Sequence, residues 1–115
     1  MEFGLRNEDL EYIKNKIKKF SEIEKAVIFG SRAKGNYQKA SDIDIAIFGD
    51  VITLDTIAKL HSDLEELSPM PYMFDIVSFN DIDNYALKDH IIRVGKTIFE
   101  RRPIFRWLFT KKIIK

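Results

Sequence analysis

Cysteine is absent from this chain of 115 residues, and no long apolar run is present. Without cysteine there is no disulfide, no thiolate nucleophile and no cysteine-bound zinc or iron–sulfur centre, which fits a reducing compartment such as the cytoplasm. A membrane-spanning helix needs about 18 to 20 apolar residues in succession, and the polar, acidic first residues do not resemble a signal peptide. We therefore expect a cytoplasmic protein without a membrane span.

Acidic residues are missing from the last stretch, 101–115, which holds six lysines and arginines. The rest of the chain then has 13 Lys and Arg against 18 Asp and Glu, a net charge of −5. The same stretch carries Trp107 and several large apolar side chains. We expect two parts: a body over residues 1–100, large enough for one modest core, and a basic, aromatic tail over residues 101–115.

Apolar periodicity predicts alternating helices and strands along the body. Leu10, Ile13 and Ile17 recur at helical spacing, whereas KAVIF and IDIAIF are short apolar runs typical of buried strands. Asn7 and Asn80 are expected to cap the first and the last helix. The expected order is helix 8–20, strand 25–29, helical turn after 31, strand 43–48, helix from 53 or 55 to about 67, strand 72–79, helix to 94 and edge strand 96–100. This order predicts an α/β fold of the α+β type: a small mixed sheet with helices mainly on one face.

Three aspartates are the candidate metal ligands. Asp42 and Asp44 open one strand and point the same way, because side chains alternate along a strand, and Asp75 lies in the next strand. Each alone has an ordinary explanation: a turn residue, a solvent-facing strand residue or a buried ion pair. If the strands are neighbours in the right register, the carboxylates converge and would repel one another unless a hard cation such as Mg²⁺ joins them. His61 and His90 are expected on helices far from this site.

Gly30-Ser31 is the candidate phosphate-binding turn. It follows a strand and precedes a helical turn, where a glycine lets a phosphate approach the backbone and a serine hydroxyl can bind its oxygens. An ordinary strand-to-helix turn would look the same. Arg32 and Lys34 could neutralise nucleotide phosphates, and they are equally well explained as solvated loop cations.

The combined pattern resembles the minimal nucleotidyltransferases of the DNA polymerase beta superfamily, specifically the MntA-like antitoxins. The signature of that family is Gly-Ser, ten residues and Asp-x-Asp, and Gly30-Ser31 and Asp42-Ile43-Asp44 match it without a gap. The third metal aspartate of the family falls on Asp75. The resemblance covers about residues 5–100 and implies the nucleotidyltransferase fold.

The resemblance also implies an activity. Two Mg²⁺ ions would lie on Asp42, Asp44 and Asp75, and Gly30 and Ser31 would help hold the phosphates of ATP. The reaction would transfer AMP to a hydroxyl and release pyrophosphate. In this family the acceptor is a tyrosine of a partner HEPN-domain ribonuclease toxin, which the modification silences, and we expect the adjacent gene to encode that partner.

Two other functions stay open. The chain could be a non-catalytic binding module that neutralises its partner by contact alone. It could also be a nucleotidyltransferase that acts on a small molecule or an RNA. The short chain argues against the last two acceptors, because related enzymes add further domains to bind them, and we do not expect a nucleic-acid partner.

Overall fold

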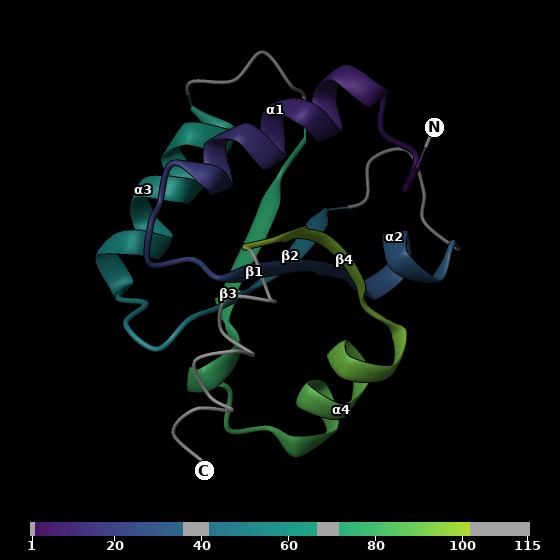
Figure 1. The fold of residues 1–115 in the computed structure, drawn as a ribbon. Coiled ribbons are helices and arrows are strands. Elements are labelled where there is room, and N and C mark those ends of the chain that lie inside the picture. The colour runs from purple at the N-terminus through teal and green to yellow at the C-terminus, as the bar shows by residue number, and fades with distance from the viewer. Residues whose placement is uncertain (1, 36–41, 67–71, 102–115) are drawn as a thin grey trace, which may run out of the picture.

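The computed structural model describes residues 2–35, 42–66 and 72–101, which form a mixed four-stranded sheet in the order β3-β2-β1-β4 (Figure 1). β1 (Lys25–Phe29) runs antiparallel to both β2 (Ile43–Phe48) and β4 (Lys96–Glu100). β2 runs parallel to β3 (Phe74–Ser78), which forms the other edge. The predicted mixed sheet, its element order and the edge position of residues 96–100 are confirmed.

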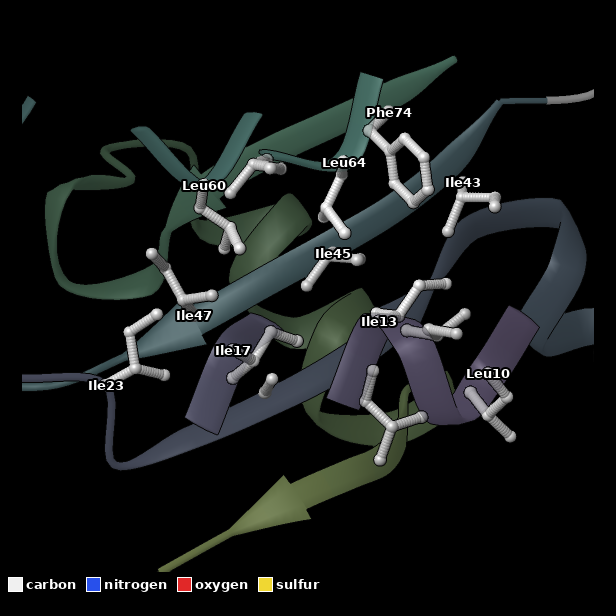
Figure 2. Packing of buried hydrophobic residues seen from close by; sticks show 14 of the residues in the cluster. Leu10, Ile13, Ile17, Ile23, Ile43, Ile45, Ile47, Leu60, Leu64 and Phe74 are labelled. Carbon is white, nitrogen blue, oxygen red and sulfur yellow. The ribbon is translucent and has the colours of Figure 1, made fainter. Parts of the chain in front are cut away.

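The larger core lies between the sheet and two long helices, α1 (Asn7–Lys18) and α3 (Leu54–Glu65). Both helices turn an apolar stripe toward the sheet, and alternate residues of the strands meet it, as Figure 2 shows. The prediction that the helices pack mainly on one face is confirmed. The labelled members of this core are Leu10, Ile13, Ile17, Ile23, Ile43, Ile45, Ile47, Leu60, Leu64 and Phe74.

The opposite face of the sheet carries α4 (Tyr85–Val94) and a smaller apolar cluster, which includes Phe29, Ala46 and Ile91. The five-residue helix α2 (Gly30–Lys34) follows β1 directly, and a short 3₁₀ turn, η1 (Phe79–Asp81), follows β3. Because Asp44 alternates with the core residues Ile43 and Ile45, its side chain projects on the face that α4 covers. This face therefore holds the candidate site.

The two predicted asparagine caps are wrong. Asn7 is the first residue of α1, and the cap position belongs to Arg6, whose side chain makes no capping hydrogen bond. α4 is capped by Asn84, whose Oδ1 accepts from the backbone N–H of Leu87 at 3.2 Å. Asn80 lies in η1, and its side chain donates to a backbone carbonyl of the loop after β2 at 2.9 Å. The predicted continuous helix is therefore replaced by η1 and a separate α4 that begins at Tyr85.

Arg101, the first residue of the predicted tail, is bound to the body. Its backbone N–H donates to the carbonyl of Glu24 at 2.9 Å. Its guanidinium donates to the carbonyls of Ile23 at 2.7 Å, Phe20 at 2.8 Å and Lys18 at 2.9 Å. The contacts fasten the end of β4 to the end of α1, and the rest of the predicted tail lies outside the described residues.

Each helix in the described part of the chain is too short or too polar to cross a membrane.

Candidate active site

Strand pairing brings two of the three candidate aspartates side by side. Asp44 of β2 and Asp75 of β3 are direct partners in the register of the parallel pair. Residues in register on neighbouring strands share a face of the sheet, so both carboxylates lie on the face that α4 covers. Asp75 is exposed because β3 is an edge strand, whereas Asp44 is half-buried. The condition set by the sequence, neighbouring strands in the right register, is met.

The charges of the three aspartates act on one another. Asp42 lies exposed immediately before β2, two residues from Asp44. Burial raises the pKa of Asp44, and the negative charges of Asp75 and then Asp42 raise this pKa further. A half-buried carboxylate that is repelled by two others gains from a nearby cation. The electrostatics therefore favour a cation at this end of the sheet.

Gly30 makes room for Asp44. Its φ of +74° lies in the left-handed region, which disfavours residues with a side chain. A Cβ atom at this position would overlap the carboxylate of Asp44, whose strand partner is Phe29, the preceding residue. Glycine is thus required both by the backbone turn and by the close approach of the carboxylate. The sequence predicted a close approach at Gly30, and the group that the structure places there is the side chain of Asp44.

Ser31 and Lys34 lie on α2 beside this turn. The helix begins at Gly30, two residues earlier than predicted, and ends at Lys34; the backbone N–H of the following Gly35 donates to the carbonyl of Ser31 at 3.0 Å. Ser31 is half-buried and Lys34 is exposed. Because α2 begins at Gly30, which adjoins the carboxylate of Asp44, both side chains lie in the same part of the molecule as Asp44.

Arg32 occupies a different environment from the one expected. It is only 2% exposed. Its Nη1 donates to the carbonyl of Phe3 at 2.8 Å, and its guanidinium carbon lies 5.2 Å from the centroid of the Tyr72 ring. Arg32 is therefore not a solvated loop cation, and its guanidinium already binds groups of the protein. Its predicted contact with nucleotide phosphates gains no support from this placement.

The expectation that His90 lies far from the aspartates is wrong. α4 packs on the face that carries Asp44, and the His90 ring meets Phe29 edge-on, with centroids 6.3 Å apart and planes 79° apart. The positive charge of His90 acts against the other influences and lowers the pKa of Asp44. Sequence reasoning predicted the end of the last helix at Val94, but it did not determine which face of the sheet the helix covers. The sequence signal for the position of His90 was its apolar neighbour Ile91. Ile91 is buried, and it fixes the orientation of α4 against the sheet.

His61 lies on α3, across the sheet from the aspartates, as expected. Its Nε2 is 2.8 Å from Oε2 of Glu65, one helical turn away. The same carboxylate oxygen accepts from the backbone N–H of Phe74, at the start of β3. His61 therefore belongs to a contact between α3 and β3 and not to the candidate site.

The donor chemistry of the aspartates fits magnesium, which prefers carboxylate oxygens. The mutual repulsion at Asp44 and the room left by Gly30 agree with that fit. Among residues 2–35, 42–66 and 72–101, no three acidic or histidine side chains lie close enough together to surround an ion. Asp42 and Asp75 are exposed, so their side chains can turn toward Asp44 without disturbing the core.

Comparison with known proteins identifies the family. A family model described as polymerase beta, nucleotidyltransferase, matches residues 11–104. Among curated proteins, no sequence matches this chain. Solved structures that share its fold include a toxin–antitoxin with AMP-PNP, with 21% identity and a TM-score of 0.66, covering 96% of this chain and 85% of the other.

Two further solved structures are similar. The toxin–antitoxin MntA-HepT has 19% identity and a TM-score of 0.64, with 95% of this chain and 84% of the other covered. A tri-AMPylated Shewanella oneidensis HEPN toxin in complex with its MNT antitoxin gives 22% identity and a TM-score of 0.57, over 91% and 83% of the chains. These similarities show a shared fold. Because the family model spans most of the sequence, this chain belongs to the polymerase beta nucleotidyltransferase family.

Proposed function

We propose that this protein is a Mg²⁺-dependent nucleotidyltransferase that transfers AMP from ATP to a tyrosine hydroxyl of a partner HEPN-domain toxin and so acts as its antitoxin. The observation that carries the proposal is the in-register pair of Asp44 and Asp75, with Asp42 beside it and Gly30 against it. The similar structures support the choice of nucleotide and partner, since one holds AMP-PNP and another an AMPylated HEPN toxin.

The residues of the site would have two roles, metal binding and phosphate binding. Asp42, Asp44 and Asp75 would hold the metal, which when bound neutralises phosphate charge and activates the attacking oxygen. Gly30 and Ser31 would bind phosphate oxygens through backbone N–H groups and the serine hydroxyl. In the transfer, the acceptor oxygen bonds to the α-phosphorus and releases its proton to the solvent. The bond from that phosphorus to the bridging oxygen breaks, and pyrophosphate leaves with the electron pair.

The position of Asp75 suits a protein acceptor. It is exposed on the edge strand β3, so a hydroxyl group carried by another protein can approach it from outside the sheet. Lys34, exposed on α2, adds a positive charge that would attract phosphate.

The test is transfer of label from ATP carrying a labelled α-phosphate. The intact protein, Mg²⁺ and the HEPN protein of the adjacent gene are expected to give a labelled partner, and a chelator should stop the reaction. Asp44→Asn should lower the rate at least 100-fold, because the variant loses ligand charge at nearly constant size. Asp83→Asn, an exposed acid before α4, is the matched control and should transfer AMP normally. Absence of label with the intact protein would contradict the proposal.

Neutralisation by contact alone is the second candidate. A variant in which Asp42, Asp44 and Asp75 are all changed to asparagine separates the two functions. If this variant still blocks the partner ribonuclease as well as the intact protein does, contact suffices; if the ribonuclease stays active, transfer is required.

A further inference from the structure

Arg32 is the one basic side chain that is buried among the residues described by the structure. Buried arginines are rare unless they are paired, so its partners indicate what it does. They include the carbonyl of Phe3, 2.8 Å from Nη1, and the ring face of Tyr72, 5.2 Å from the guanidinium carbon. The first partner is 29 residues before Arg32 and the second is 40 residues after it. Arg32 therefore connects three segments that are distant in the sequence.

Each of these segments adjoins a part of the site. Arg32 itself lies on α2, one residue after Ser31. Tyr72 leads into β3, whose second residue is Asp75. Phe3 belongs to the N-terminal turn, which lies near α2 in Figure 1 and is closed by a hydrogen bond from Leu5 N to Glu2 O at 2.9 Å. The guanidinium thus lies between the turn that carries the glycine and serine and the strand that carries the third aspartate.

The N-terminal turn needs an external contact. Phe3 is the only residue other than glycine with a positive φ in the described part of the chain, at 58°. Such a conformation persists only where surrounding groups hold it. The hydrogen bond from Arg32 to the Phe3 carbonyl supplies such a contact, and it joins this turn to α2.

We propose that Arg32 is a positioning residue, which locks α2 to the N-terminal turn and to the approach of β3 so that Ser31 keeps a fixed place relative to Asp75. The inference deepens the proposed transfer reaction and rests on it. It assigns Arg32 a role in geometry in place of a direct contact with the nucleotide. Small displacements of the groups that bind a reacting phosphate reduce turnover, because the attacking oxygen is then no longer aligned with the phosphorus.

Arginine and lysine should differ sharply in this role. A planar guanidinium can lie flat on the Tyr72 ring while one of its N–H groups donates to the Phe3 carbonyl. A lysine ammonium is a compact charge on a flexible stem and cannot keep both contacts in the same geometry. A residue that only attracted phosphate would tolerate lysine, which is itself a common phosphate binder. The substitution Arg32→Lys therefore separates the two roles.

The experiment measures kcat and the KM for ATP in full-length variants with the partner protein. Arg32→Lys and Tyr72→Leu are each expected to lower kcat about 10- to 100-fold with the KM within about threefold of the original. The double variant should be no worse than the poorer single variant, because both changes remove the same contact. Tyr72→Phe keeps the ring face and should retain kcat. Lys59→Met, which removes an exposed charge on α3, should change neither quantity.

Several results would overturn the inference. They are an unchanged kcat in Arg32→Lys, a raised KM with normal kcat, and losses that add in the double variant. If the intact protein transfers no AMP, the same variants are compared by thermal unfolding. Non-additive shifts in Tm for Arg32→Lys and Tyr72→Leu would then uphold the lock while the proposed transfer fails, and additive shifts would refute the lock as well.

Discussion

At the scale of single residues, the environment of Asp44 favours a bound cation and destabilises the protein while no cation is bound. It is half-buried, it is in register with Asp75, and its carboxylate fills the space beside Gly30. Burial and the negative charges of Asp75 and Asp42 disfavour its ionised form and raise its pKa, whereas the charge of His90 opposes them. An ionised group in such a position stores unfavourable electrostatic energy until a cation arrives.

The raised pKa of Asp44 makes a prediction about stability and pH. The folded state holds the proton of Asp44 more tightly than the unfolded chain does. Protonated Asp44 therefore stabilises the folded protein, and this contribution is fully present below the ordinary pKa of aspartate. It is lost as the pH rises through the raised pKa. Asp44→Asn cannot ionise, so its advantage in Tm over the original protein should be small at low pH and grow toward neutral pH.

Thermal unfolding from about pH 3 to pH 7 measures this difference. At neutral pH, added Mg²⁺ should raise the Tm of the original protein and leave that of Asp44→Asn nearly unchanged. Asp83→Asn is again the control, and it should follow the original protein in both experiments. An equal Tm advantage of Asp44→Asn at every pH would show that ionisation of Asp44 does not limit stability.

At the scale of secondary-structure elements, the start of α3 is fixed by a pair of threonines. The Thr53 hydroxyl accepts from the backbone N–H of Thr56 at 3.2 Å, and the Thr56 hydroxyl lies 3.4 Å from the backbone N–H of Thr53. The buried Thr56 hydroxyl also donates to Oε2 of Glu22 at 2.7 Å, and this bond lowers the pKa of Glu22. The contacts tie α3 to the segment before β1.

We therefore predict that Thr56→Val lowers the free energy of unfolding by about 1–3 kcal/mol at neutral pH, because a buried hydrogen-bonded hydroxyl is lost. The lowered pKa of Glu22 contributes stability above the ordinary pKa of glutamate, and this contribution disappears as the pH falls through the lowered value. The cost of Thr56→Val should accordingly shrink in acid. Urea unfolding at two pH values measures it, with the exposed Thr97→Val of β4 as control. A cost that is the same at both pH values would contradict the role given to Glu22.

At the scale of the whole molecule, Arg101 joins the last strand to the first helix. Its guanidinium binds the carbonyl of Lys18, the last residue of α1, and those of Phe20 and Ile23 in the segment between α1 and β1. The ring of Phe99 lies beneath the guanidinium, 5.1 Å from the centroid to the guanidinium carbon. These contacts hold together segments that are about 80 residues apart in the chain.

Arg101→Met is expected to lower the free energy of unfolding by about 1–3 kcal/mol, since carbonyl groups lose a charged donor and only part of the packing remains. Arg93→Met is the matched control, because Arg93 makes one exposed ion pair with Asp89 and should contribute less than 1 kcal/mol. Chemical denaturation of both full-length variants decides between them. Equal losses would mean that Arg101 is no more than a surface charge.

The sequence by itself determined the elements and the motif. The strands at 25–29 and 43–48 were predicted with the bounds that the structure shows, because each is an apolar run that a glycine ends. The spacing of Gly30-Ser31 and Asp42-x-Asp44 is local as well, and it led to the family that the comparison confirms. Such information lies within a few residues of each position.

Only the tertiary structure decided which residues meet. The parallel register of Asp44 with Asp75, the place of His90 against Phe29 and the burial of Arg32 against Phe3 all join residues about 30 or more apart in the chain. No local pattern encodes these contacts, because they depend on how the helices and strands pack as a whole. The sequence identified the aspartates and the glycine as candidate site residues. Packing determined that Asp44 lies beside Asp75, that His90 approaches them and that Arg32 is held by groups of the protein.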